Sequence, residues 1–131
     1  MSKIDDPLEV QFRQVHPSWV DEGHPTRQAF SPSTKDKGCL SLDRSIDITA
    51  KQSYESFTAL GLMSEAVYGI AASEFEEEPN PIECYASPIE EDDHINPHHS
   101  HAAFSGLNKS QRKAKITELR RVALSRGKLH P

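Results

Sequence analysis

The chain has 131 residues, an apolar fraction of 35% and a formal net charge of −5 at pH 7. This length fits one domain, residues 1–131, with a single core, and the low apolar fraction predicts a small core with long surface loops. No run approaches 18 apolar residues, which excludes a membrane-spanning helix.

The N-terminal stretch MSKIDDPLEV lacks the apolar segment of a secretory signal. Two cysteines, Cys39 and Cys84, are too few for a disulfide scaffold, so we expect reduced thiols and a cytoplasmic protein.

Charge is distributed unevenly along the chain. Residues 109–131 carry eight Lys/Arg and one acid, a segment charge of +7, and the remaining residues carry −12. Such asymmetry is typical of an interaction tail, or of opposite surfaces that pair within one molecule.

The first half of the chain predicts two short strands separated by loops. Residues 1–7 are expected to be a frayed N-terminus. Leu8, Val10 and Phe12 alternate with polar residues, which indicates a half-buried strand that ends at His16-Pro17. Trp19 and Val20 should fold back on the core, residues 21–28 should form a loop, Phe30 should anchor the loop 31–38, and residues 39–42 should form the second strand.

The clearest local signal is a helix that begins at Thr49, which can form a capping box with Gln52. Its apolar stripe is Ala50, Tyr54, Phe57 and Leu60, and Gly61 supplies a left-handed closing residue. Residues 66–72 are apolar on both faces, which predicts a central strand covered on each side.

Residues 74–100 are predicted to be an acidic and His-rich loop region, interrupted by one strand within 82–86. A short apolar run at 102–104 precedes Asn108 and Ser110, which are good caps for a basic C-terminal helix over 108–126. Its apolar stripe is Ile116, Leu119, Val122 and Ala123, and Gly127 should stop it. Four to five short strands packed by two helices make an α+β domain, in which Tyr54, Phe57, Ile116 and Leu119 should be buried.

The order of these segments carries a resemblance. The segments that carry the resemblance are, in order, FRQVHPSW, AFSPSTKDKGCLSLDR, a helix that begins with TA, the strand VYGIAA and a final HAAFSGL with a basic helix. With these segments, the chain resembles a family of short bacterial proteins of about 130 residues. The resemblance spans nearly the whole chain and implies a one-domain bacterial protein. That family has no established activity, so it implies no catalytic residue.

A histidine cluster, His94, His98, His99 and His101, suggests metal binding, because neutral imidazole is a common ligand for Zn, Cu and Ni and Cys84 would add a thiolate. The spacing matches no standard zinc pattern, and neither cysteine belongs to a CxxC pair. We therefore expect surface histidines without a bound metal, and no other cofactor.

A second set of residues, Arg13, His16, Ser41 and Glu76, follows the Arg–Ser–Glu order of ADP-ribosyltransferases, with Glu74 and Glu76 as an E-x-E pair. The resemblance implies that Arg13 holds dinucleotide phosphates, Ser41 orients the nicotinamide ribose and the Glu stabilises an oxocarbenium-like state. The chain departs from that family because it lacks the Ser-Thr-Ser triplet, has little secondary structure between Arg13 and Ser41, and is short for the fold. A structural Arg and a capping Ser are the simpler interpretation.

A nucleophile–base pair is a related hypothesis, with Cys39 or Ser41 near His16. No GxSxG motif frames either residue. Cys39 beside Leu40 fits a small buried hydrophobic residue equally well.

The basic helix predicts an interaction surface. A cationic helix binds phosphate backbones by charge, but this one lacks aromatic residues for base stacking, so nucleic-acid binding should be non-specific. The acidic remainder of the chain favours an acidic protein partner instead. The candidate binding residues are Trp19, Lys35, Asp36, Arg44, Arg112, Lys113, Arg120 and Arg121.

The sequence thus favours a small cytoplasmic protein that binds a macromolecular partner, most simply a protein, through the loops of residues 12–44 and the basic helix. The alternative is a compact enzyme acting on a nucleotide-like or phosphate-bearing ligand, and a metal-dependent site at the histidine cluster is third. Convergence of Arg13, His16 and Ser41 on one concave pocket would favour the enzyme.

Overall fold

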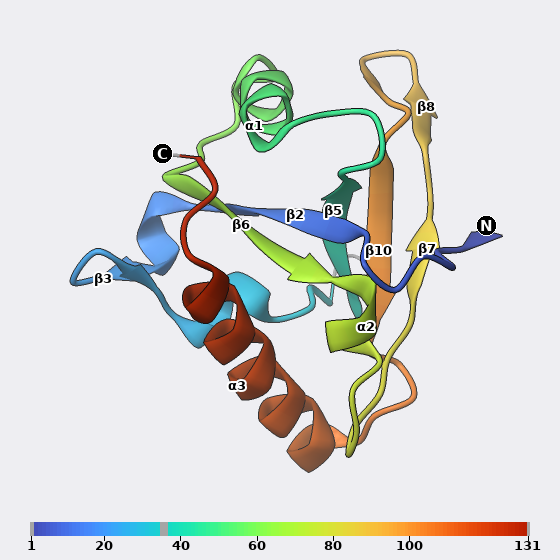
Figure 1. The fold of residues 1–131 in the computed structure, drawn as a ribbon. Coiled ribbons are helices and arrows are strands. Elements are labelled where there is room, and N and C mark those ends of the chain that lie inside the picture. Colours follow the sequence, from blue (N-terminus) through green and yellow to red (C-terminus); the bar gives the residue numbers. More distant parts are fainter. Residues whose placement is uncertain (1, 35–36, 131) are drawn as a thin grey trace.

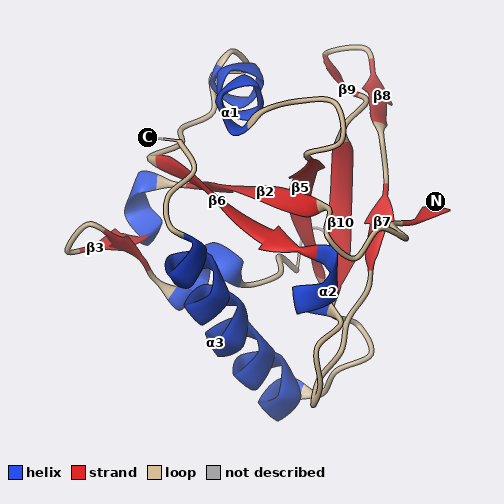
Figure 2. Ribbon diagram, in the orientation of Figure 1, coloured by secondary structure: helices blue, strands red, loops and turns tan. Residues whose placement is uncertain are grey.

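The computed structural model describes residues 2–34 and 37–130, and a six-stranded antiparallel sheet forms its centre (Figures 1 and 2). The spatial order of the strands is β1-β7-β10-β5-β2-β6. These strands are β1 (Ser2–Lys3), β2 (Val10–Val15), β5 (Cys39–Arg44), β6 (Ala66–Ala71), β7 (Cys84–Ala86) and β10 (His99–Ala103).

Three α-helices, two 3-10 helices and two small hairpins surround the sheet. The α-helices are α1 (Ala50–Thr58), α2 (Ala72–Phe75) and α3 (Lys109–Arg126), and the 3-10 helices are η1 (Pro17–Trp19) and η2 (Arg27–Phe30). The hairpins pair β3 (Val20–Asp21) with β4 (His24–Pro25), and β8 (Ile89–Glu91) with β9 (His94–Asn96). The α+β class is confirmed, and the described residues hold more strands and one more α-helix than expected, because two- and three-residue strands leave no periodic pattern in the sequence.

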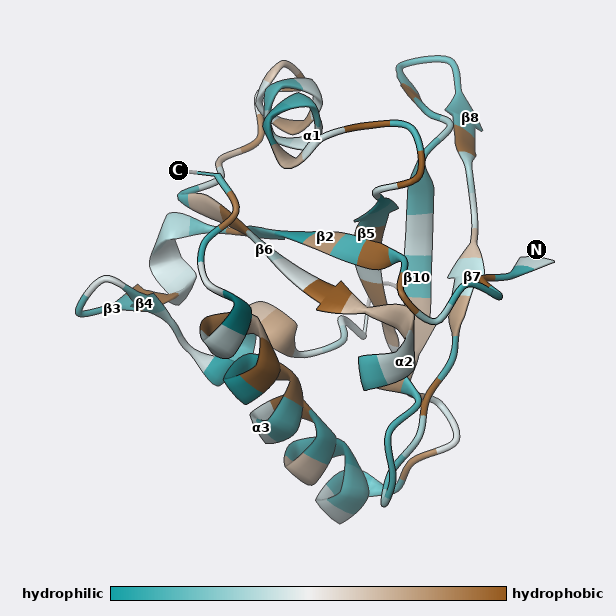
Figure 3. Cartoon of the chain, in the orientation of Figure 1, coloured by the Kyte–Doolittle hydropathy of each residue, from teal (hydrophilic) through white to brown (hydrophobic). Residues whose placement is uncertain are grey.

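The hydrophobic core lies between one face of the sheet and α3 (Figure 3). Leu40, Leu42 and Ala102 from adjacent strands point to this side and join Ile116 and Leu119 of α3 in one cluster. The predicted α3 stripe is therefore confirmed, with Asn108 as N-cap in a capping box with Gln111. Phe30 is fully buried, and Trp19 and Val20 pack against the core as expected.

Residues 2–4 are held against the sheet, whereas fraying was predicted for residues 1–7. β1 pairs with β7, the Ile4 N–H donates to the Cys84 carbonyl at 2.9 Å, and the Ile4 side chain is buried. The first long strand begins at Val10, and Leu8, expected on its inner face, is 80% exposed. The alternation of apolar and polar residues placed the start of this strand too early, because a strand that is covered on both faces does not show such alternation.

Residues 74–100 are not one long loop. They contain the end of α2, the strands β7, β8 and β9, and the start of β10. β10 is an inner strand, where Ser100 and Ala102 are buried while His99 and His101 face the opposite side. The polar sequence HSHAA has weak strand propensity, and its pairing with both neighbours overrides that propensity.

The helix that starts at the Thr49–Gln52 capping box forms as predicted, but its burial differs from expectation. Tyr54 and Phe57 are only half-buried, and Ser53 is the buried residue of α1. α1 packs over the sheet face opposite α3, as Figure 1 shows, and two residues of its apolar stripe, Phe57 and Leu60, border an open cleft. Tyr54 packs against the ring of His130 instead, with ring centroids 4.8 Å apart. The second half of the stripe therefore forms a cavity wall and not part of a filled core.

The apolar strand β6 is covered on both faces, as expected, but it is the edge of the sheet. The C-terminal residues cover this edge, because the Val67 N–H donates to the His130 carbonyl and the Leu129 N–H to the Val67 carbonyl, both at 2.9 Å. Backbone pairing with the tail protects an otherwise exposed edge.

Candidate functional site

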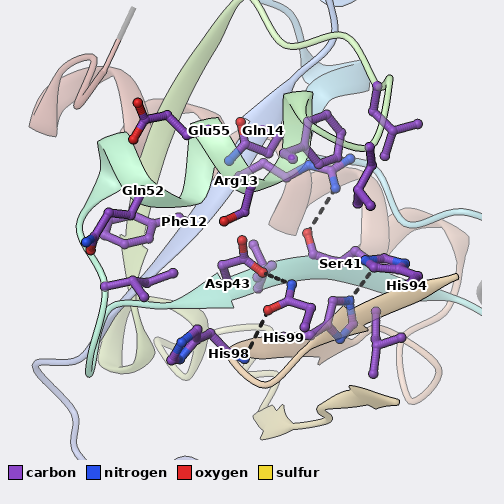
Figure 4. Close-up of a pocket in the computed structure, with 18 of the residues that line it drawn as sticks. Phe12, Arg13, Gln14, Ser41, Asp43, Gln52, Glu55, His94, His98 and His99 are labelled. Carbon is purple, nitrogen blue, oxygen red and sulfur yellow. Dashed lines mark hydrogen bonds between the residues drawn. The ribbon is translucent and has the colours of Figure 1, made fainter. Parts of the chain in front are cut away.

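A cleft of about 950 Å³ lies on the sheet face opposite α3 (Figure 4). Its floor is formed by β2, β5 and the start of β10; one wall is α1 with the loop that follows it, and the other is the β8–β9 hairpin. A cavity of this size is in the range that holds a small-molecule ligand.

The floor opens where two central strands separate. β2 and β5 pair at Gln11–Arg44 and Phe12–Asp43, and their register continues no further. The Arg13 guanidinium occupies the gap: its Nε donates to the Ala29 carbonyl at 2.7 Å and its Nη1 to the Ser41 carbonyl at 3.0 Å. Its Cζ also lies 5.1 Å from the centre of the Trp19 ring. Arg13 thus holds together strands that no longer bond to each other.

Ser41 and His99 form a hydrogen-bonded pair on this floor. The Ser41 Oγ lies 3.1 Å from the His99 Nε2, and the His99 Nδ1 lies 2.9 Å from the Ser87 carbonyl oxygen. Because a carbonyl only accepts, the neutral imidazole carries its proton on Nδ1 and presents the Nε2 lone pair to the Ser41 hydroxyl. A hydroxyl, an imidazole and a third group that orients the imidazole are the parts of an activated nucleophile.

The contact with Ser87 links this pair to a second histidine. The Ser87 Oγ lies 3.0 Å from the His99 Nδ1 and 2.9 Å from the Nδ1 of His101, whose ring stacks on Tyr85 at 5.6 Å. Partial burial lowers the pKa of His101, which favours its neutral form, and the neutral imidazole accepts from the Ser87 hydroxyl. One set of proton positions therefore satisfies the four contacts that join Ser41, His99, Ser87 and His101.

Asp43 connects the floor to both walls of the cleft. Its Oδ2 accepts from the Ser53 hydroxyl of α1 at 2.7 Å, and its Oδ1 accepts from the Asn96 amide of β9 at 2.8 Å. The Gln14 amide also donates to the Ser53 Oγ at 2.9 Å. A carboxylate with partners on both sides fixes the spacing of the walls, so the cleft is preformed.

The structure brings together most of the predicted catalytic and histidine residues. Residues that line the cleft are Arg13, His16, Trp19, Ser41, His94, His98 and His99. The partner of Ser41 is His99, whereas the sequence suggested His16. The His16 Nδ1 accepts from the Ser18 N–H at 3.0 Å and caps η1.

Glu76 does not line the cleft. Its carboxylate pairs with the Lys3 Nζ at 3.1 Å, and Glu74 pairs with Arg126 at 2.7 Å, so neither acid of the E-x-E pair joins Arg13 and Ser41. Arg44 is engaged elsewhere, since it donates to both carboxylate oxygens of the buried Glu9 at 2.8 and 2.9 Å. Lys35 and Asp36 lie outside the described residues.

Three of the four clustered histidines, His94, His98 and His99, line the cleft, and His101 does not. Within residues 2–34 and 37–130, no three His, Cys, Asp or Glu side chains are placed to hold a metal ion. Cys84, considered as a partner of His98, is buried, and its burial raises the pKa of the thiol.

The basic helix is less exposed than its sequence suggests. Lys115 is 1% exposed and donates to the Glu74 and Glu77 carbonyls at 3.3 and 3.1 Å. Arg112 and Arg120 are half-buried and donate to the carbonyls of Leu107 and Pro25. The exposed cations Lys109, Lys113 and Arg121 follow one stripe at four- and eight-residue spacing.

Sequence reasoning missed Asp43, Ser87 and Asn96, which organise the cleft. They are ordinary polar residues in the sequence, and only strand pairing brings Ser87 to His99 and Asn96 to Asp43. The one available signal was the alternation of His99 and His101 with small residues, which fits a strand with both imidazoles on one face.

Comparison of the chain with protein-family models, with curated proteins and with solved structures gives no match. No helix among the described residues is long and apolar enough to cross a membrane.

Proposed function

We propose that the cleft is the active site of a small hydrolase, in which Ser41 is the nucleophile and His99 the general base. The observation that carries this proposal is the 3.1 Å contact between the Ser41 Oγ and the His99 Nε2, with the tautomer of His99 fixed by the Ser87 carbonyl at 2.9 Å. Both side chains line the cleft, so a substrate there would reach the hydroxyl.

The reaction follows from the groups present. The Ser41 Oγ attacks the carbonyl carbon of an ester while its proton passes to the His99 Nε2. The tetrahedral intermediate expels the alkoxide, which takes that proton and leaves as an alcohol. Water then attacks the acyl-Ser41 ester, its proton passes to His99 and on to the Ser41 Oγ, and a carboxylic acid is released.

Arg13 is a positioning residue in this scheme. Its bond to the Ser41 carbonyl fixes the backbone that carries the nucleophile, at the point where β2 and β5 separate. The Asp43 contacts keep the walls at a constant distance from the nucleophile.

A serine-directed fluorophosphonate probe tests the proposal. Mass spectrometry should locate the probe on Ser41 in the wild-type protein, and Ser41→Ala should abolish labelling. His99→Gln, which can bond to Ser41 but cannot act as its base, should slow labelling by about 10²-fold or more. Ser56 is the matched control, because it lines the same cleft and no hydrogen bond between it and an imidazole is found in the described structure.

Three results would each refute the proposal: labelling that persists in Ser41→Ala, equal labelling of Ser41 and Ser56, or an absence of labelling in folded wild-type protein. Circular dichroism of each variant confirms that the fold is retained.

A second candidate function is the docking of an acidic protein segment on α3. The observation in its favour is the stripe of Lys109, Lys113 and Arg121, which form no ion pair within the described part of the chain. An oligoglutamate peptide should bind with an affinity that falls steeply with salt, and changing all three residues to Gln should remove this binding. Preferential binding of one DNA or RNA sequence at high salt would contradict this candidate.

A further inference from the structure

The exposed apolar side chains of this protein are concentrated at one place. Seven large apolar residues in the described ranges are more than a third exposed, and four of them, Leu60, Leu62, Met63 and Ile95, line the cleft. Met63 is 59% exposed and Ile95 is 73% exposed. Isolated exposed apolar residues are common, but a group that borders a single cavity indicates an apolar ligand.

These residues belong to both walls. Leu60, Leu62 and Met63 follow α1, whereas Ile95 lies at β9 across the opening. Phe57 belongs to the α1 wall, and Phe12, which pairs with Asp43 across β2 and β5, belongs to the floor (Figure 4). Apolar side chains thus occur on both walls and on the floor of the cleft that holds Ser41.

The charge of the cleft disfavours an anionic ligand. Three carboxylates line it, Asp43, Glu55 and Glu91, against one guanidinium, Arg13. Arg13 donates two of its five N–H groups to backbone carbonyls, and its single positive charge is outnumbered by the three carboxylates. A phosphate would meet net negative charge, while an uncharged molecule would not.

We infer that the substrate is an uncharged ester whose apolar acyl chain lies between the Leu60–Met63 loop and the β8–β9 hairpin, with its carbonyl carbon at Ser41. This inference rests on the proposed function for the cleavage step. The placement of the acyl chain against the rim is inferred from the apolar lining residues alone.

A series of p-nitrophenyl esters, from acetate to decanoate, tests the chain-length dependence. Each methylene buried against the walls should raise kcat/KM by up to about fourfold, until the channel is filled. Met63→Asp and Ile95→Asp should lower kcat/KM for the octanoate ester by at least about tenfold, and by much more than for the acetate ester, whose acyl group has no chain to contact the rim. Both side chains are exposed, so neither change should disturb the fold.

Leu8→Asp is the matched control, because Leu8 is equally apolar and exposed but does not line the cleft. It should behave as the wild type with every ester. A flat chain-length profile, or an equal loss for the Leu8 and Ile95 variants, would overturn the inference.

A second measurement separates this inference from the proposed function. p-Nitrophenyl octyl ether cannot be cleaved, and its binding to wild type and Ser41→Ala can be followed through Trp19, the only Trp, which lines the cleft. If the ether binds and Ile95→Asp weakens that binding while no ester is hydrolysed, the apolar site stands and the hydrolase proposal fails. If acetate is hydrolysed but the ether does not bind, the hydrolase stands and the acyl-chain inference fails.

Discussion

Replacing Arg13 by Met should destabilise the protein strongly, because Arg13 closes the gap between β2 and β5. Met keeps an unbranched apolar stem but removes the donors to the Ala29 and Ser41 carbonyls, at 2.7 and 3.0 Å. A hydrogen bond from a charged donor contributes about 1.5–3 kcal/mol, so we expect a loss of about 3–5 kcal/mol in the free energy of unfolding. This is a large fraction of the roughly 5–15 kcal/mol that stabilises a domain.

Urea denaturation followed by circular dichroism at 222 nm measures this loss. Trp19 fluorescence should not be the only signal, because Arg13 lies 5.1 Å from that ring and its removal would change the emission locally. The free energy of unfolding of Arg13→Lys should lie between those of the wild type and Arg13→Met, since one ammonium group cannot reproduce the two-pronged guanidinium geometry.

Arg27→Met is the matched control. Arg27 is an exposed arginine of η2, and its change should alter stability by less than about 0.5 kcal/mol. If Arg13→Met cost less than about 1 kcal/mol, or no more than Arg27→Met, the bridging role assigned to Arg13 would be wrong.

Two further perturbations test the fold. Phe57→Ala should lower the free energy of unfolding by about 1–2 kcal/mol in urea denaturation, because Phe57 is half-buried in the cleft wall. A fully buried Phe would lose roughly 3–5 kcal/mol. A loss above about 3 kcal/mol would place Phe57 in the core. The hydrogen bond from Arg44 lowers the pKa of Glu9, so the folded state favours the carboxylate. This contribution is present above the unfolded pKa and is lost as the pH falls through the folded one, so wild type should lose stability from about pH 5 downward more steeply than Glu9→Gln. Parallel pH profiles of unfolding free energy would contradict this assignment.

Local chemistry determined several elements before any tertiary contact was known. The Thr49–Gln52 and Asn108–Gln111 capping boxes start α1 and α3, because each involves residues only three positions apart. The α3 stripe and the anchoring role of Phe30 could also be predicted from the sequence, since a 3.6-residue period and a lone aromatic residue in a polar loop are local signals.

The position of β10 as an inner strand of the sheet could not be predicted from the sequence. HSHAA has weak strand propensity, and it becomes an inner strand only because β5 and β7 supply backbone partners on both sides. The same pairing puts His99 and His101 on one face, where both contact Ser87, while only His99 contacts Ser41.

The sequence by itself determined the α+β class and the starts of α1 and α3. The tertiary structure decided which side chains meet, because Ser41 and His99 lie 58 positions apart and their contact depends on strand register. Register follows from the burial of whole faces, and a shift of one residue would turn Ser41 away from the cleft. The burial of Lys115 also depends on tertiary contacts. Its charge predicts exposure, but the packing of α3 brings the carbonyls of Glu74 and Glu77 within hydrogen-bonding distance of its ammonium group. These hydrogen bonds offset the free-energy cost of burying the charge.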